Sequence, residues 1–184
     1  MSLAANADIF GPGREALALA RKAFGGRGFF VPAPSSPPDF VRVPYTFGEP
    51  EVDRHRRLTE LAETLSRAVA MESTEAEEGT GRIIPTPVGE PQGLDTIAFF
   101  TACRVACPQA HLVVDLELLG HKLGQLCLSF GADEIMGSIV DRRELRLGAR
   151  AGSNELTRDE AAQLLRASGF DPCERSPDGK VPKR

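Results

Sequence analysis

The sequence has no long hydrophobic run. No stretch of its 184 residues approaches the ~18 consecutive apolar residues of a membrane-spanning helix. The first residues also lack the basic segment followed by an apolar segment that is typical of a secretory signal peptide. We therefore expect a cytoplasmic protein without a membrane partner.

Concentrated positive charge is also absent. The net charge is −4, and the 22 lysine and arginine residues are scattered, apart from short clusters such as Arg54, Arg56 and Arg57. Proteins that follow a phosphate backbone concentrate their cations on one face or along one helix. The charge pattern therefore predicts that nucleic acid is not a partner.

Cysteines are few, and the common catalytic motifs are missing. The four cysteines, at positions 103, 107, 127 and 173, have neither the spacing of a disulfide framework nor that of a zinc site. The sequence contains no P-loop, dinucleotide fingerprint or serine–histidine–aspartate set. We expect no metal site, and we expect Cys103, Cys107 and Cys127 to be buried as small apolar residues.

The length allows one domain with a core of its own, but not a complete eight-fold α/β barrel, which typically needs ~250 residues. Composition divides the chain into four parts. These are a helix and short strand in 1–31, a proline-rich linker in 32–39, a βα-repeat region in 40–150, and a capping helix with a loose tail in 151–184.

Hydrophobic periodicity switches repeatedly between the periods of strands and helices. Strands are expected at 28–31, 40–47, 82–88, 111–118 and 134–140, and helices at 13–24, 51–69, 93–107 and 119–130. A last helix should begin at Thr157, where Glu160 completes a capping box, and end before Gly169. This order predicts an α/β fold with a mostly parallel sheet and flanking helices, covering about half of a TIM-type barrel.

Residues 118–148, LLGHKLGQLCLSFGADEIMGSIVDRRELRLG, carry a family resemblance. They resemble the barrel-closing strand–helix–strand of menaquinone-pathway radical S-adenosylmethionine enzymes, of the aminofutalosine synthase and dehypoxanthine futalosine cyclase type. The matching positions include Leu119, Gly120, Lys122, Gln125, Phe130, Gly131, Ala132, Asp133 and Gly137. Residues 45–63, 82–91 and 156–176 resemble further family segments, and together these stretches cover about three-quarters of the chain.

One family feature is missing from this sequence. The chemistry of the family depends on a C-x3-C-x2-C loop that binds an iron–sulfur cluster, and the chain has no such loop. The pair Cys103 and Cys107 would place Ala110 at the third ligand position, within a segment that is expected to be helical. We therefore expect no iron–sulfur cluster and no other cofactor. By the resemblance, PAPSSPPD at 32–39 replaces the cluster loop and the strands that follow it.

The candidate site residues lie around the expected strand 111–118. Its even-numbered residues should face the helices, while His111, Val113, Asp115 and Glu117 face the former barrel lumen. Asp115 and Glu117 then form either one wall of a ligand pocket or part of an open lumen that is filled with water. His121 and Glu117 form a candidate acid–base pair, so Asp115, Glu117 and His121 are the catalytic candidates.

Two further positions complete the ligand-binding candidates, which are Asp115, Glu117, Asp133 and Arg142. The resemblance places Asp133 in a binding loop near the active site, whereas its sequence context also fits a helix-to-strand turn. Arg142, with Arg143 and Arg146, would bind an anion or form a solvated turn.

Three functions remain open at this point. The first is a non-catalytic binding or accessory relative of the menaquinone-pathway enzymes. The second is a small enzyme that uses acid–base residues at the strand ends, and the third is a structural partner. Because half a barrel leaves strand edges and apolar surface open, we expect a homodimer or a complex with a menaquinone-pathway protein. A small-molecule ligand is compatible with all three.

Overall fold

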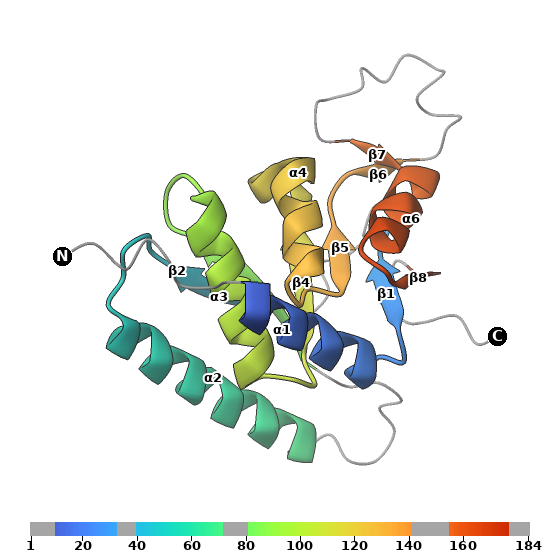
Figure 1. The fold of residues 1–184 in the computed structure, drawn as a ribbon. Helices are drawn as coiled ribbons and strands as arrows, with labels where there is room; N and C mark the ends of the chain where they lie inside the picture. Colours follow the sequence, from blue (N-terminus) through green and yellow to red (C-terminus); the bar gives the residue numbers. More distant parts are fainter. Residues whose placement is uncertain (1–9, 33–39, 72–80, 141–154, 177–184) are drawn as a thin grey trace.

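The computed structural model describes residues 10–32, 40–71, 81–140 and 155–176 (Figure 1). Five helices and eight strands lie in these ranges. The helices are α1 (Phe10–Ala23), α2 (Glu51–Met71), α3 (Gly93–Ala106), α4 (Leu116–Ser129) and α6 (Arg158–Ala167). The strands are β1 (Arg27–Phe30), β2 (Phe40–Tyr45), β3 (Arg82–Pro87), β4 (His111–Asp115), β5 (Glu134–Met136), β6 (Ile139–Val140), β7 (Leu156–Thr157) and β8 (Asp171–Glu174).

Six of the strands form one sheet in the order β2-β3-β4-β5-β1-β8, and all five neighbouring pairs are parallel. β4 lies inside this sheet between β3 and β5, and its buried apolar residues fit a strand that is covered on both edges. The short strands β6 and β7 form a second parallel pair. The predicted α/β fold with a mostly parallel sheet is therefore confirmed, and the arrangement is compatible with part of a TIM-type barrel.

The two faces of the sheet bury different kinds of side chain. Because successive strand residues point to opposite faces, Ile83, Leu112 and Val114 share the face that packs against the helices in the main hydrophobic core. Residues of the other parity, including Ile84 and Val113, are also fully buried, but they lie outside that cluster. The sheet is therefore covered on the helix side and closely packed on part of its opposite face.

The C-terminal segment is part of the sheet. Residues 171–184 were expected to form a loose tail, but Asp171–Glu174 pair in register with all four residues of β1. Arg175, which follows, is 3% exposed. That expectation was wrong because β8 pairs with β1, which lies far away in the sequence. Local composition cannot indicate a contact between such distant segments. The first and last sequence regions thus share one sheet with the βα repeat.

Two expected strands have different limits. The strand predicted at 111–118 ends at Asp115, whose Oδ1 accepts hydrogen bonds from the backbone N–H groups of Glu117 (3.1 Å) and Leu118 (3.3 Å). This N-cap begins α4 at Leu116. The strand predicted at 134–140 is divided, because β5 stays in the large sheet while Ile139 and Val140 pair with β7.

The last helix begins as the sequence predicted. The side-chain oxygen of Thr157 accepts from the backbone N–H of Glu160 at 3.2 Å, and the Glu160 carboxylate accepts from the backbone N–H of Thr157 at 2.7 Å. This reciprocal capping box satisfies two donors that the first turn of α6 would otherwise leave unpaired. After the helix, Gly169 has a φ of 82°, the left-handed conformation that favours glycine at a helix end.

Gly28 allows β1 to pack closely against α6. A Cβ atom at this position would lie 2.8 Å from Leu165 Cδ2 and 2.8 Å from Phe170 Cβ. We predict that Gly28→Ala lowers the free energy of unfolding by about 1–3 kcal/mol because the added methyl group overpacks the core. Gly93→Ala is the matched control, since a Cβ there would meet nothing within 4 Å. Urea denaturation measures both, and equal stabilities of the two variants would contradict the packing argument.

Candidate functional site

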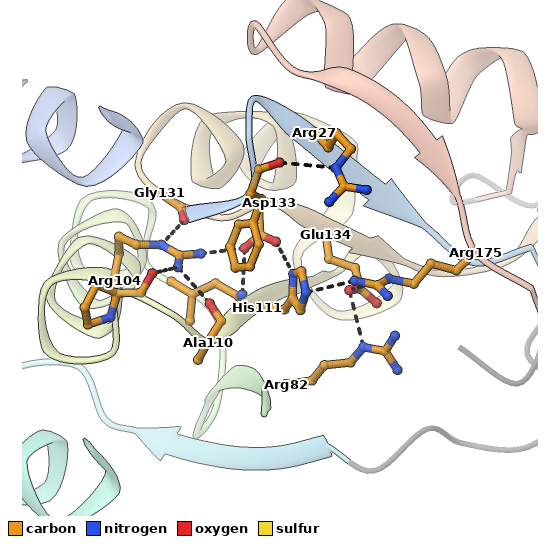
Figure 2. A network of polar contacts seen from close by, with 12 residues as sticks. Arg27, Arg82, Arg104, Ala110, His111, Gly131, Asp133, Glu134 and Arg175 are labelled. Atoms are coloured by element: carbon orange, nitrogen blue, oxygen red, sulfur yellow. Dashed lines mark hydrogen bonds and ion pairs between the residues drawn. The ribbon is translucent and has the colours of Figure 1, made fainter. Parts of the chain in front are cut away.

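A network of buried charged residues lies at the N-terminal ends of β4 and β5 (Figure 2). Arg104 comes from α3, His111 begins β4, Asp133 immediately precedes β5, Glu134 begins it, and Arg175 follows β8. All five residues are at most 3% exposed. Charged groups so deeply buried need partners, because leaving water without them is costly.

Arg104 is held by four hydrogen bonds. Its Nε donates to the carbonyl of Gly131 at 2.8 Å, and one terminal nitrogen donates to the carbonyls of Ala110 (2.7 Å) and Pro108 (3.0 Å). The other terminal nitrogen donates to Asp133 Oδ1 at 2.5 Å. The guanidinium therefore fastens α3 to the turns that lead into β4 and β5.

Asp133 uses both of its carboxylate oxygens. Oδ1 also accepts from the backbone N–H of Leu112 at 2.8 Å, and Oδ2 lies 2.5 Å from Nδ1 of His111. On the far side of the ring, Arg175 contacts His111 Nε2 at 2.9 Å. Since a guanidinium can only donate, Nε2 must accept, which places the imidazole proton on Nδ1 and directs it to Asp133.

Glu134 extends the network to other strands. Its Oε2 lies 3.3 Å from Nε of Arg175 and 3.4 Å from Nε of Arg82, which begins β3. The ring of Phe24 stacks on His111 with 4.1 Å between centroids. The network thus joins strands β3, β4 and β5 to the segment after β8. Because these charges are buried, water screens their electrostatic interactions less than it would at the surface.

The position and burial of this network point to a structural role. Ligands of parallel α/β sheets bind at the C-terminal ends of the strands, whereas His111 and Glu134 are the first residues of theirs. Asp133 is fully buried and completely engaged by protein groups. Its position therefore favours the interpretation as a turn residue over that as a ligand-binding residue.

At the C-terminal end of β4, the predicted pair of carboxylates does not form one wall. Asp115 caps α4, and its Oδ2 lies 3.9 Å from Nη1 of Arg42. Glu117 belongs to the first turn of α4 and is exposed. The two carboxylates were expected on one strand face, but the strand ends between them because the Asp115 side chain starts the helix. Arg142, the other predicted ligand-binding residue, lies outside the described residues.

His121 lies in a different environment from the other candidates. Gly120 has φ 71° and ψ 166°, and this break inside α4 places His121 at the start of a second helical piece. There His121 lines an open pocket of about 310 Å³ between α4 and α6, and Glu117 is not among the described residues that line it. The other lining residues are Gln125, Glu155, Leu156, Glu160, Gln163, Leu164 and Ala167. Sequence analysis missed this grouping because α4 and α6 lie far apart in the chain.

Three of the cysteines are buried, as predicted, at 0% exposed for Cys103 and Cys127 and 6% for Cys107. Cys103 lies within α3, and Cys107 is its C-terminal cap. Burial raises the pKa of each of these three thiols, so the uncharged form is favoured. Across the described ranges, no group of three or more histidine, cysteine or acidic residues is placed to hold a metal ion.

The described helices also bear on membrane contact. Within residues 10–32, 40–71, 81–140 and 155–176, no helix combines the length and apolar character needed to cross a bilayer.

Comparison with known proteins gives one informative similarity. A region of 86 residues, 46% of the chain, is 31% identical to aminodeoxyfutalosine synthase from Streptomyces coelicolor. The similarity supports a relation to that family. The matched region spans 22% of the length of the Streptomyces protein, so most of that enzyme has no counterpart in the match. No protein-family model matches the chain.

The network predicts different costs for two arginines near β8. Arg175→Met should lower the free energy of unfolding by about 3 kcal/mol, because it removes the donor to His111 and one cation beside the buried Glu134. Arg158→Met should cost less than about 1 kcal/mol, since the Arg158–Glu174 pair is half-exposed. Urea denaturation of both variants tests this, and a larger loss for Arg158→Met would contradict the structural role of the network.

The cysteines should differ sharply in reactivity. In the folded protein at mildly alkaline pH, we predict that iodoacetamide modifies Cys173, the half-buried thiol, well before the three buried ones. Burial blocks access of the reagent to Cys103, Cys107 and Cys127. It also raises the pKa of each thiol, so little of the reactive thiolate is present. Peptide mass spectrometry locates the label, and denaturant should make all four cysteines react. Rapid labelling of Cys103 without denaturant would contradict the described core.

Proposed function

We propose that this protein is a binding or accessory relative of the menaquinone-pathway radical S-adenosylmethionine enzymes that holds no iron–sulfur cluster and does not catalyse their reaction. The observation that carries the proposal is the position of β1. It pairs with β5, although β2 is the next strand in the chain. In a closed parallel barrel the first strand pairs with the last, and the second lies on its other side.

The sheet order is what a shortened barrel would give. β1 and β5 meet as the first and last strands of a barrel meet, while β3, β4 and β5 separate β1 from β2. On the free side of β1, where a second barrel strand would lie, the chain places β8. Such an order follows if strands between β1 and β2 have been lost, which is where the sequence resemblance places the missing cluster loop.

The use of polar residues supports a role without catalysis. Asp133, His111 and Glu134 are buried and paired within the network, and Asp115 caps a helix. The similarity to aminodeoxyfutalosine synthase covers 22% of the length of that protein. We therefore propose a relation in fold and pathway for this chain, but we do not extend the activity of that enzyme to it.

Association with a partner stays a prediction, and the edge strands support one geometry for it. The outermost strands of the six-stranded sheet, β2 and β8, each contain a proline, Pro44 and Pro172. The Pro44 carbonyl also accepts a hydrogen bond from Arg57. Prolines on edge strands oppose pairing between sheets. We therefore propose that a second copy or a pathway partner contacts a face of the sheet instead of extending it.

The proposal predicts that anaerobic reconstitution with iron and sulfide loads no stoichiometric cluster. Visible absorbance and iron analysis should show no specific binding, and added reductant should not cleave S-adenosylmethionine. The variant carrying both Cys103→Ser and Cys107→Ser is the control, and it should behave like the wild type. A cluster that forms in the wild type and is lost in the variant would overturn the proposal.

A further inference from the structure

Exposed large apolar side chains lie at the C-terminal ends of three neighbouring strands. The described residues contain nine large hydrophobic side chains that are at least 37% exposed. Five of them follow β2 or β3 directly or lie in the first turn of the helix after β2, β3 or β4: Phe47, Val52, Val88, Leu94 and Leu118. The other four are spread over α1, β2, α3 and α4. Because β2, β3 and β4 are parallel neighbours, the five side chains belong to one end of the sheet.

The segments that carry these side chains are held in place. The backbone N–H of Val88 donates to the carbonyl of Tyr45 at 2.8 Å, which joins the chain after β3 to the end of β2. Arg54 donates to Asp95 at 3.0 Å, so the first turns of α2 and α3 are joined as well. After β4, the side chain of Asp115 caps α4. A partner would therefore meet a surface that is already ordered, which lowers the entropy cost of binding.

The same strand ends carry exposed negative charge. Glu51, Glu90 and Glu117 are exposed, and none of the three forms an ion pair with another described residue. Three arginines of α2 already contact a carboxylate each: Arg54, Arg56 and Arg57. The apolar side chains are thus accompanied by carboxylates that can attract a cationic partner. We call the five apolar residues and these three glutamates the strand-end surface.

We propose that the strand-end surface docks a basic, apolar segment of a partner protein, whose lysine or arginine side chains face the carboxylates. Apolar side chains that are spread over three segments match an extended partner better than one small ligand. A second copy of this chain would bring like charges together, and an anionic membrane surface would be repelled. The surface is separate from the sheet face proposed above for a second copy or pathway partner, and it does not depend on the absence of an iron–sulfur cluster.

Three peptides of equal length are matched probes, composed of lysine and leucine, of lysine and serine, and of glutamate and leucine. In an NMR titration, the lysine–leucine peptide should give saturable shifts of the backbone amides of residues 47, 88, 94 and 118. The lysine–serine peptide should bind more weakly, and the glutamate–leucine peptide should not bind. Added salt should weaken the binding because it screens the exposed charges. Equal binding of all three peptides, or shifts spread evenly over the molecule, would overturn the proposal.

Variants locate the binding surface. Val88→Ser should weaken binding of the lysine–leucine peptide by about tenfold, and Glu90→Gln by about two- to fivefold. Val105→Ser is the matched apolar control, because Val105 is 56% exposed, close to the 60% of Val88, but lies at the other end of α3. Glu15→Gln on α1 is the matched charge control. Thermal unfolding confirms that each variant is folded, and controls that weaken binding as much as the test variants would refute the surface.

Analytical ultracentrifugation separates a partner protein from a second copy. A monomer, or a dimer that Phe47→Ser leaves intact, agrees with the proposal. A dimer that Phe47→Ser dissociates would show that this surface joins two copies, and the proposal would be wrong. A cluster found in the reconstitution experiment would refute the proposed function and leave the peptide result intact.

Discussion

The contact between Arg104 and Asp133 fastens the helix α3 to the paired strands β4 and β5. Both side chains are fully buried; Arg104 also donates to backbone carbonyls before β4 and β5, and Asp133 also accepts from the backbone N–H of Leu112 in β4. Neutralising only one partner would leave an uncompensated charge in the core, which costs far more than the pair itself contributes. Strand pairing joins β4 to β5, and the ion pair with the hydrogen bonds of Arg104 fixes α3 relative to the start of both strands.

This arrangement divides the molecule into two ends with different properties. At the N-terminal ends of the strands, charged residues are buried and paired, and His111 is held between Asp133 and Arg175 (Figure 2). Toward the C-terminal ends, Asp115 caps α4 and lies near Arg42, and Glu117 is exposed. The structure thus places its buried ion pairs at one end of the strands and more exposed acidic residues at the other.

The sequence predicted where the helices and strands lie better than it predicted which of them contact one another. Apolar alternation located β2, β3 and β4, and the capping box at Thr157 located α6, because these signals depend on neighbouring residues. The end of β4 was missed because Leu116 and Leu118 continue the alternation of the strand, although the Asp115 side chain begins a helix there. Local pattern does not distinguish an alternating strand from a capped first turn.

The candidate site shows the same limit more strongly. The sequence singled out Asp133 but could not identify its partner Arg104, which lies 29 residues before it. For the same reason it could not pair Arg175 with His111, which lies 64 residues earlier. A lone charged residue in a strand is no evidence of burial until its partner is known. The sequence also could not show that His121, Glu155 and Glu160 line the same pocket, because this depends on the packing of α4 beside α6.

The place of β1 between β5 and β8 has a consequence for synthesis of the chain. Phe29 and Phe30 are made early, yet their strand neighbours begin at residues 134 and 171. During translation β1 therefore gains its strand neighbours only after residues 134 and 171 have been made. Contacts this distant slow folding and expose aggregation-prone surface. Pairing of β1 is therefore expected to be one of the late steps in assembling the sheet.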